Sequence, residues 1–371
     1  MNLNTSCPRI SFGIIVLNGE PFTKYNLRNI YEFAYEIVIA EGASYKASHV
    51  ANEDGHSSDN TLNILRKFKK NEDPEDKIQI VTAEDEGHLN GFWPGEKDEQ
   101  SQAFSKRCSG EFLWQLDIDE FYDKADIRKI IQLLKQTKED TCFTIAAHNY
   151  FLSPRIKQVG SYFNHPCFAG EPWGRIRRIF TWGSDYKYYS HRPVTIKNSY
   201  GEIIHKKNKV DLTSELGIYM HHYSVFSISK WYEKLAYYQN HNWKYDIREG
   251  LNQDEIVRYQ NWCKISNQYR TINFLSFSSD SLSTLDSLYR HFADDETKQA
   301  VNHMLREFDN VDYLTIFRFN ILSTGDSVIR NLWYVVKKLI SLAILNVEIT
   351  LCKLGIIDSI NEFRFDSNQK N

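Results

Sequence analysis

The sequence predicts an α/β protein: a mostly parallel sheet with helices on both faces, followed by a helical C-terminal region. Three observations lead to this fold class. Short, continuous apolar runs recur through residues 1–140, as in strands that are buried on both faces. Segments with apolar residues at helical spacing alternate with these runs, which is typical of a parallel sheet. From residue 230 onward, helical spacing prevails.

The N-terminal part alternates strand and helix in a regular order. Strands are predicted over residues 11–17, 36–40, 77–82 and 111–116. Helices are predicted over residues 23–34, 58–70, 99–108 and 127–137. In the second of these helices Leu62, Leu65 and Phe68 recur at helical spacing, and Asp59 or Ser58 is the predicted N-cap.

The next part of the chain has shorter strand-like pieces. They cover residues 142–151, 174–182, 186–196 and 217–226. We expect them to extend the same sheet and to add a crossing hairpin. The chain therefore divides into an α/β domain over residues 1–229 and a helical region over residues 230–371, with a polar break near residue 280 as the alternative boundary.

Composition excludes several classes of protein. The chain has 45 Lys+Arg against 48 Asp+Glu, so it lacks the basic excess of a nucleic-acid-binding protein. Its six cysteines form no CxxC pair, which argues against a zinc ribbon or a disulfide framework and favours a reducing compartment. The N-terminus lacks the pattern of a signal peptide, and no apolar stretch reaches the roughly 18–20 residues of a membrane span. We therefore predict a cytoplasmic protein with no nucleic-acid partner.

Polar residues follow the predicted strands where a ligand site would form. Asn18, Glu41 and Asp117 stand at predicted carboxyl ends, the edge at which open α/β sheets bind ligands. Asp117 and Asp119 are spaced so that a strand-end turn can direct both carboxylates at one hard divalent cation. Such a cation neutralises a diphosphate leaving group. The alternative is solvated charge at a strand end. No glycine-rich phosphate loop follows any strand, so dinucleotide and P-loop functions lose support.

Four segments, in order, resemble motifs of family 2-type glycosyltransferases with the GT-A fold, of the bacterial surface-glycan type. They are Leu-Asn-Gly-Glu at 17–20, Ala-Glu-Gly-Ala-Ser at 40–44, Asp-Gly-His-Ser-Ser-Asp-Asn-Thr at 54–61, and the strand at 109–119 that ends in Asp-Ile-Asp. The resemblance spans residues 11–122. The chain departs from the family where residues 45–53 separate two segments that are normally joined, and where Gln102 replaces the usual Asn.

The resemblance implies a Rossmann-like domain that moves a sugar from a UDP- or GDP-linked donor to a glycan or lipid-linked acceptor, with inversion. It implies a Mn²⁺ or Mg²⁺ ion at Asp117 and Asp119, the latter being also catalytic, with a late histidine as third ligand. His221 and His222 would point to opposite faces of a strand, and we favour His222. The alternative is a packed, hydrogen-bonded histidine.

The resemblance also implies residues that bind the donor. Asn18, Glu20 and Glu41 would line the nucleotide pocket, together with Gln102, and Lys97 would contact a phosphate. Turn chemistry is the alternative role for Glu41, and a solvated side chain is the alternative for Lys97.

A further segment, from Arg175 to His191, resembles one found in transferases that build lipopolysaccharide cores. Arg175, Arg177 and His191 would contact phosphate or acceptor, although an exposed strand face would explain the arginines equally well. An inverting displacement needs a group to take the proton of the acceptor hydroxyl, and we predict Glu171 for this role, with Asp185 as a weaker choice.

Three tryptophans and one helix leave alternatives open. Trp93, Trp173 and Trp182 could stack on sugar rings, but packing in the core is the simpler expectation. Residues 328–344 have the spacing of an amphipathic helix, which would lie on an anionic membrane surface at the inner face or pack on the catalytic domain. Two functional alternatives remain: a nucleotidyltransferase, and a non-catalytic protein that binds glycans or a partner.

Overall fold

The computed structural model describes residues 7–95, 97–151, 157–158, 167–168, 171–172, 175–225, 230, 233–234, 236–237 and 277–278. The predicted helical region beyond residue 237 lies outside these residues apart from the short strand β15 (Phe277–Ser278). The candidate boundary near residue 280 and the segment 328–344 lie outside them too. No helix of the described residues is long and apolar enough to cross a membrane.

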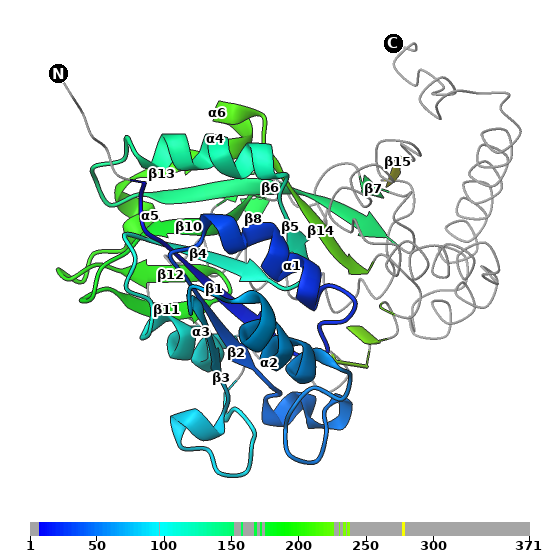
Figure 1. The fold of residues 1–371 in the computed structure, drawn as a ribbon. Helices are drawn as coiled ribbons and strands as arrows, with labels where there is room; N and C mark the ends of the chain where they lie inside the picture. Colours follow the sequence, from blue (N-terminus) through cyan, green and yellow to red (C-terminus); the bar gives the residue numbers. More distant parts are fainter. Residues whose placement is uncertain are drawn as a thin grey trace, which may run out of the picture.

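The centre of the fold is a parallel sheet in the order β3-β2-β1-β4 (Figure 1). Its strands are β1 (Ile10–Val16), β2 (Glu36–Glu41), β3 (Ile78–Val81) and β4 (Phe112–Asp117). Val16 lies opposite Glu41, and Ile15 lies opposite Asp117. This register brings the carboxyl ends of β1, β2 and β4 to one edge, as predicted for parallel strands.

The later strands extend the same sheet, which confirms the expectation for this part of the chain. Antiparallel β10 (Ile176–Thr181) pairs with both β4 and β6 (Cys142–Phe151). Two further strands pair parallel with β6, namely β13 (Lys209–Asp211) and β14 (Tyr219–Val225). Short pieces complete the pairing: β5 (Glu120–Phe121), β7 (Lys157–Gln158), and the separate pair β8 (Cys167–Phe168) and β9 (Glu171–Pro172).

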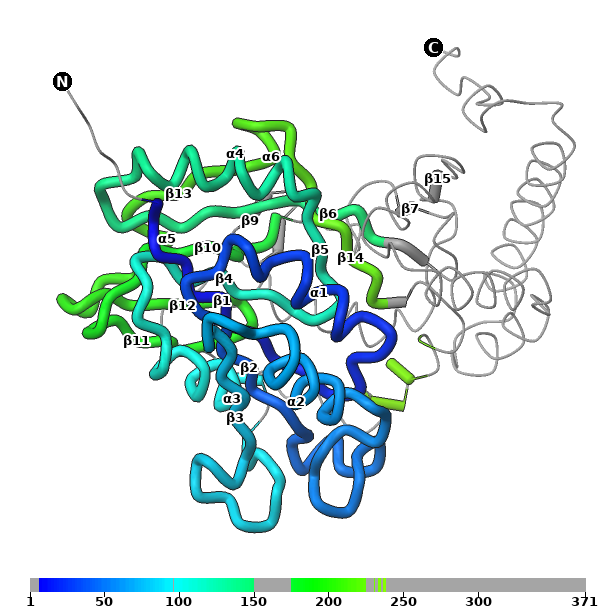
Figure 2. The backbone as a smooth tube through the Cα atoms, viewed as in Figure 1, coloured from blue at the N-terminus to red at the C-terminus, as the bar shows by residue number. Residues whose placement is uncertain are grey.

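Helices cover both faces of the sheet. One face carries α1 (Thr23–Ile30), α2 (Thr61–Glu72), α4 (Lys124–Leu134) and α6 (Leu212–Leu216). The other carries α3 (Lys97–Ser105), α5 (Ile204–Lys207) and the hairpin of β11 (Lys187–His191) and β12 (Val194–Lys197). Figure 2 shows α3 beside β11 on this second face.

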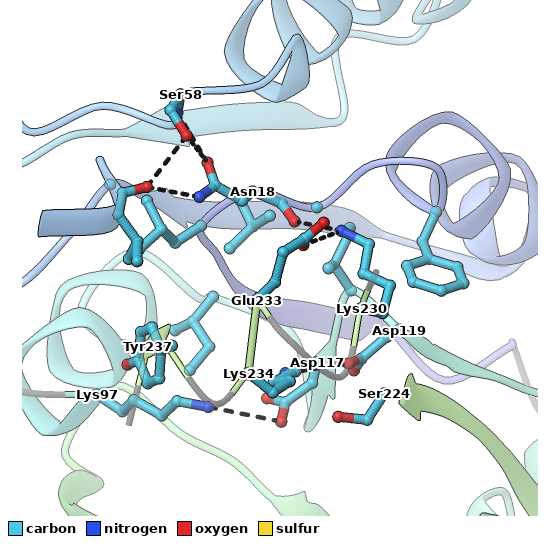
Figure 3. A pocket seen from close by; sticks show the side chains of 18 of the residues that line it. Asn18, Ser58, Lys97, Asp117, Asp119, Ser224, Lys230, Glu233, Lys234 and Tyr237 are labelled. Carbon is cyan, nitrogen blue, oxygen red and sulfur yellow. Dashed lines mark hydrogen bonds and ion pairs between the residues drawn. The ribbon is translucent and has the colours of Figure 1, made fainter. Parts of the chain in front are cut away.

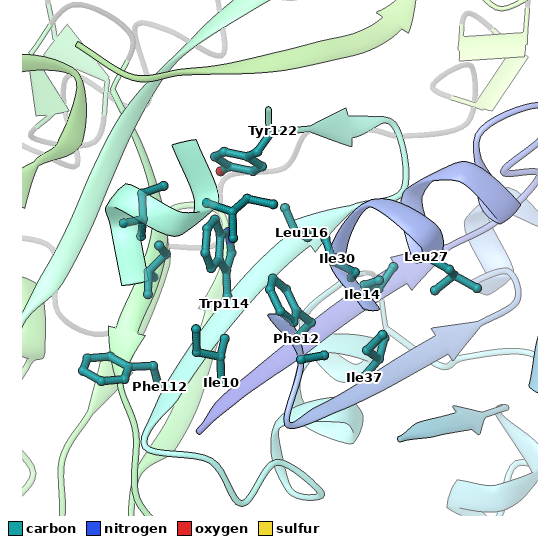
Figure 4. Close-up of a cluster of buried hydrophobic side chains, with 14 of the residues drawn as sticks. Ile10, Phe12, Ile14, Leu27, Ile30, Ile37, Phe112, Trp114, Leu116 and Tyr122 are labelled. Carbon is teal, nitrogen blue, oxygen red and sulfur yellow. The ribbon is translucent and has the colours of Figure 1, made fainter. Parts of the chain in front are cut away.

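The core explains how the central strand is held. Ile10, Phe12 and Ile14 alternate along β1 and pack toward α1, with the Phe12 ring stacked on Trp114 at a centroid distance of 5.2 Å (Figure 4). On the opposite face of β1 a Cβ atom at Gly13 would lie 2.3 Å from the ring of Phe104 in α3. Only a glycine fits there without a shift of this ring. Helix α3 therefore lies close against β1.

Predicted and observed elements differ mainly at their ends. The predicted helix at 23–34 ends at Ile30, and a 3₁₀ turn, η1 (Tyr31–Phe33), follows. The predicted helix at 58–70 begins at Thr61 and its N-cap is Asn60, so the predicted N-cap at Asp59 or Ser58 is wrong. The carboxylate of Asp59 still accepts the N–H of Thr61 at 2.9 Å. Residues 45–53 contain a 3₁₀ segment, η2 (Tyr45–Val50), and a third such turn is η3 (Glu84–Glu86). These turns, with α5, β13 and α6, were not predicted.

Candidate active site

A cavity of about 320 Å³ opens at the carboxyl edge of the sheet (Figure 3). It is lined by the ends of β1, β2 and β4, the start of α3, the end of β14, and the helical residues 230, 233–234 and 236–237. Its volume lies at the lower end of the roughly 300–1,000 Å³ of small-molecule sites. The polar lining residues used below are Asn18, Ser58, Lys97, Gln100, Asp117, Asp119, Lys230, Glu233 and Lys234.

A buried ion pair stands behind the acidic turn that follows β4. Arg178 of β10 donates from Nε to Oε2 of Glu120 at 2.8 Å and from Nη2 to Oε1. The same Oε2 accepts the backbone N–H of Asp117 at 3.1 Å. Although burial opposes it, the charges of Glu120 and Asp117 hold the pKa of the Arg178 guanidinium above its ordinary value. Glu120 is thus committed to the structure of the turn.

Asp117 is ionised and incompletely satisfied. Its Oδ1 is buried and has no hydrogen-bond partner within the described part of the chain. The Nζ of Lys97 lies 4.0 Å from its Oδ2. Burial works against the charged form, yet the charges of Lys97 and Arg178 outweigh it and hold the pKa of Asp117 below its ordinary value.

Asp119 is buried and faces a lysine and a histidine. Its Oδ2 lies 3.4 Å from Nζ of Lys234, and its Oδ1 lies 3.6 Å from Nε2 of His222. Against the effect of burial, these two groups hold the pKa of Asp119 below its ordinary value. The Nδ1 of His222 lies 2.8 Å from Oδ1 of Asn149, and its Nε2 faces Asp119.

The neighbouring histidine points elsewhere. The Nε2 of His221 lies 4.0 Å from a carboxylate oxygen of Asp123, outside the cavity lining. Only one histidine of the pair therefore approaches the acidic turn, as the strand period predicts. That histidine is His222, the one that we favoured.

The two aspartates fit a hard divalent cation, but three protein ligands do not converge. Within the described residues no group of three His, Cys, Asp or Glu side chains is placed to hold a metal ion, so the expected set of Asp117, Asp119 and His222 is not assembled. The unpartnered Oδ1 of Asp117 and the ionised Asp119 still supply the oxygen ligands that Mn²⁺ or Mg²⁺ prefers. Such ions commonly take water and substrate phosphate in the other positions.

Asn18 lines the cavity and also fixes the turn after β1. Its φ is +53°, in the left-handed region that Asn tolerates better than most residues. Its amide Nδ2 donates to the carbonyl of Val50 at 2.7 Å, and its Oδ1 accepts the N–H of Ser58 at 2.7 Å. These bonds tie the β1 turn to the inserted segment at 45–53, so the insertion contributes to the cavity wall.

Glu41 is hydrogen-bonded within the turn structure that follows β2. Its side chain is fully buried and is not part of the cavity lining. Oε1 accepts the N–H of Ser57 at 2.9 Å, and Oε2 lies 2.8 Å from Nδ1 of His56. Glu20 also lies outside the lining, and burial, with the nearby charge of Asp59, raises the pKa of its carboxyl group.

In helix α3, Gln100 is a lining residue that sequence reasoning missed. It lines the cavity and donates from Nε2 to the carbonyl of Gly42 at 2.8 Å, whereas the predicted Gln102 does not line the cavity. The two lie two positions apart and therefore on different faces of the helix. Lys97, at the start of the same helix, lines the cavity as expected.

The predicted residues of the Arg175–His191 segment do not line the cavity. Arg175 donates to Oδ2 of Asp211 at 2.7 Å, and Arg177 donates to the carbonyl of Val194 at 3.0 Å. His191 is buried, and its Nδ1 lies 2.9 Å from the hydroxyl oxygen of Ser101. Burial holds the pKa of His191 well below its ordinary value. These side chains join parts of the fold to one another.

The tryptophans and the predicted base complete the comparison with the sequence. Trp93 and Trp182 are buried, and their indole N–H groups donate to the carbonyls of Glu41 and Cys108 at 3.0 Å, so both pack in the core. Trp173 lies outside the described residues. For Glu171 the structure describes only the backbone, which pairs with Phe168.

A set of lining residues after β14 was missed although a signal was present. Lys230, Glu233, Lys234 and Tyr237 are spaced by three and four positions, which places them on one face of a helix. Lys230 donates from Nζ to the carbonyl of Asn18 at 3.3 Å and to Glu233 at 2.6 Å. This polar face directly follows the histidine strand, and its spacing could have indicated a lining helix.

No family model matches the sequence, and no curated protein does. The fold is similar to TarS 1–349 of Staphylococcus aureus, at 11% identity over 68% of this chain and 71% of that chain, with a TM-score of 0.36. Its complex with UDP-GlcNAc aligns at 14% identity over 47% of this chain and 45% of that chain, with a TM-score of 0.30. A mannosyltransferase of Pyrobaculum calidifontis, in complex with GDP-Man and Mn²⁺, aligns at 19% identity over 41% of this chain and 37% of that chain, with a TM-score of 0.27.

This chain spans less than half the length of the second and third of these structures. At TM-scores below 0.5 the alignments assign no function, and the fold is established by the strand order and register. The described residues form a mostly parallel sheet with helices on both faces. This is the Rossmann-like architecture that the resemblance to the GT-A fold implies.

Proposed function

We propose that the protein is a glycosyltransferase that moves a sugar from a nucleoside-diphosphate sugar to a glycan or lipid-linked acceptor. One observation carries the proposal: two aspartates and three lysines line one cavity at the carboxyl edge of the sheet. The carboxylates suit a divalent cation, and the ammonium groups suit a diphosphate. The chain as a whole is close to neutral, so attraction for phosphate must be local.

The proposed reaction is a single displacement with inversion. The oxygen of the acceptor hydroxyl bonds to the anomeric carbon while the bond from that carbon to the diphosphate oxygen breaks, and its electron pair leaves with the diphosphate. Asp117 and Asp119 would hold a divalent metal, whose positive charge would stabilise the leaving diphosphate. Lys97 and Lys234 add charge to the same cavity. We propose Glu171 as the group that takes the hydroxyl proton.

Of the predicted donor-binding residues, we propose Asn18, Lys97 and Asp117 as direct contacts, because these line the cavity. Glu41 supports the site by holding the turn at 56–57. UDP and GDP are the nucleotides to test, because the resemblance of the sequence to family 2-type glycosyltransferases implies a UDP- or GDP-linked donor. Location in the cytoplasm and contact of residues 328–344 with the inner membrane face stay predictions from the sequence.

The test is Asp119→Asn, which removes a charge from the cavity and keeps the shape of the side chain. We expect calorimetry to show that Mn²⁺-dependent binding of UDP or GDP weakens at least about 100-fold. Loss of a residue that binds the metal directly should weaken binding more than loss of a residue that only orients a metal ligand. Sugar transfer should be lost, with an unchanged circular dichroism spectrum.

Asp76→Asn is the matched control. It is the same chemical change at an exposed residue, which lies just before β3 at the opposite edge of the sheet. This variant should bind nucleotide as the wild type does. Unchanged nucleotide binding by Asp119→Asn would refute the proposed metal site.

A further inference from the structure

Each cavity aspartate is held by a lysine from a different element. Lys97 at the start of α3 faces Asp117 at 4.0 Å, and Lys234 in the helical residues after β14 faces Asp119 at 3.4 Å. These pairs line the wall in which a donor diphosphate would lie under the proposed function (Figure 3). The carboxylates that would bind a cation are therefore already neutralised by two ammonium groups.

The geometry of these pairs differs from that of a fixed ion pair. Charge-assisted N–H···O bonds are typically about 2.7–2.9 Å long, and both lysine contacts are longer. A lysine ammonium is a point charge on a flexible stem and has no fork to match a carboxylate. About a third of the Lys234 side chain is also exposed. Neither lysine is therefore fixed to its aspartate by a short charge-assisted bond, although the attraction between the opposite charges remains.

The charge balance of the cavity indicates which ligands would draw Lys97 and Lys234 away from the aspartates. Two aspartates and two lysines sum to zero. A divalent cation alone would leave the cavity with two excess positive charges, and the diphosphate of a nucleotide-sugar alone would leave two excess negative charges. Both together restore neutrality. A divalent cation and an ammonium group also compete for the same carboxylate oxygens, so the bound cation displaces the lysines toward the diphosphate.

We infer that Lys97 and Lys234 exchange partners during donor binding: they neutralise Asp117 and Asp119 in the unliganded protein and bind the donor diphosphate once a divalent cation occupies the carboxylates. This inference rests on the proposed function and assigns the lysines to phosphate recognition. It requires that cation and diphosphate bind cooperatively, because each removes the charge imbalance left by the other. The coupling is reciprocal, as linkage demands.

The experiment compares wild type with Lys234→Met and Lys97→Met in two measurements that avoid turnover. Binding of Mn²⁺ without nucleotide is followed from the electron paramagnetic resonance signal of free Mn²⁺. Binding of UDP and of GDP at saturating Mn²⁺ is followed by calorimetry. We expect each variant to bind Mn²⁺ about threefold more tightly, because a competing cation has gone. Each should bind the nucleotide about tenfold more weakly, because a charged phosphate contact has gone.

Two controls separate direct exchange from a general change of charge. Lys230→Met removes the same charge from the same cavity, but the carboxylate partner of Lys230 is Glu233, so its Mn²⁺ affinity should rise less than that of Lys234→Met. Lys234→Arg keeps the charge but supplies a fork that matches a carboxylate, so it should hold Asp119 more firmly and bind Mn²⁺ more weakly than wild type.

Opposite shifts of the two affinities support the exchange. Unchanged or weakened Mn²⁺ binding, or unchanged nucleotide binding, in both Lys234→Met and Lys97→Met would overturn it while leaving the proposed function in place. If the wild-type protein binds neither UDP nor GDP with Mn²⁺, the proposed function fails instead.

Discussion

Strands β2 and β4 flank β1, and both lead into carboxylates at the same edge of the sheet, yet these carboxylates have different roles. At the end of β2 both oxygens of Glu41 are bonded, one by the N–H of Ser57 and the other by His56. At the end of β4 an oxygen of Asp117 is buried without a hydrogen-bond partner within the described residues, and Asp119 faces the cavity. The first end is structural, and the second is suited to a ligand.

The difference comes from the segments that pack behind each strand end. The loop before α2 folds back over β2 and brings His56 and Ser57 to Glu41. Behind β4, Arg178 takes up Glu120 and leaves the two aspartates to the cavity side. In this protein the loop next to β2 supplies the hydrogen-bond donors of Glu41, whereas Asp117 and Asp119 line the cavity.

The largest expected effect comes from the pair behind β4. Arg178→Met leaves Glu120 buried and unpaired, so we expect the free energy of unfolding to fall by about 3–5 kcal/mol. Urea denaturation measures this change. The double variant Arg178→Met/Glu120→Gln should recover much of the loss, because no uncompensated charge remains. If Arg178→Met were as stable as the wild type, the ion pair of Arg178 and Glu120 would not hold the turn after β4.

An intermediate effect is expected at the end of β2. Glu41→Gln weakens two buried hydrogen bonds, so we expect the free energy of unfolding to fall by about 1–3 kcal/mol. The control Glu53→Gln alters an exposed residue of the same loop and should stay within about 0.5 kcal/mol of wild type. If Glu41→Gln instead lost nucleotide binding as fully as Asp119→Asn, with no loss of stability, the two strand ends would be equivalent.

The smallest expected effect is the pH dependence of the stability that the hydrogen bond between His56 and Glu41 contributes. The hydrogen bond to Glu41 raises the pKa of His56 above its ordinary value of 6.5, against the effect of burial. A raised pKa in the folded state stabilises the protein below the unfolded-state pKa, and this stability is lost as pH rises through the folded-state pKa. The advantage of wild type over His56→Gln should be about 1 kcal/mol in acid and should shrink toward alkaline pH. Melting temperatures measured across this range test it, and an advantage that grows with pH would contradict it.

The sequence predicts the sheet well, because the strands follow from local patterns, whereas the position of the site stays a prediction. Apolar runs mark β1, β2 and β4, and Asp117 and Asp119 follow the last of these directly. The side-chain partners depend on contacts between distant segments. His56 reaches Glu41 because the insertion folds back, which no periodicity shows.

The partners of the arginines and of the lining lysines likewise depend on contacts between distant segments. A register shift in β10 between Arg177 and Ile179 interrupts the alternation that predicts which side chains share a face. Arg178 then pairs with Glu120, fifty-eight positions away, and Arg175 pairs with Asp211. Lys234 could have been found from its helical spacing, but its place at Asp119 depends on how the chain turns after β14.

The most direct test of the central claim is a thermal-shift panel of UDP, GDP and their sugar conjugates, with and without Mn²⁺. A ligand at 100 times its Kd stabilises the folded state by about 2.7 kcal/mol, which corresponds to a rise of about 5–10 °C in Tm for a domain of this size. We predict such a rise with a UDP- or GDP-linked sugar, in Mn²⁺ and not in its absence. No rise with any of these nucleotides in Mn²⁺ would contradict the assignment of the β4 end as a donor site.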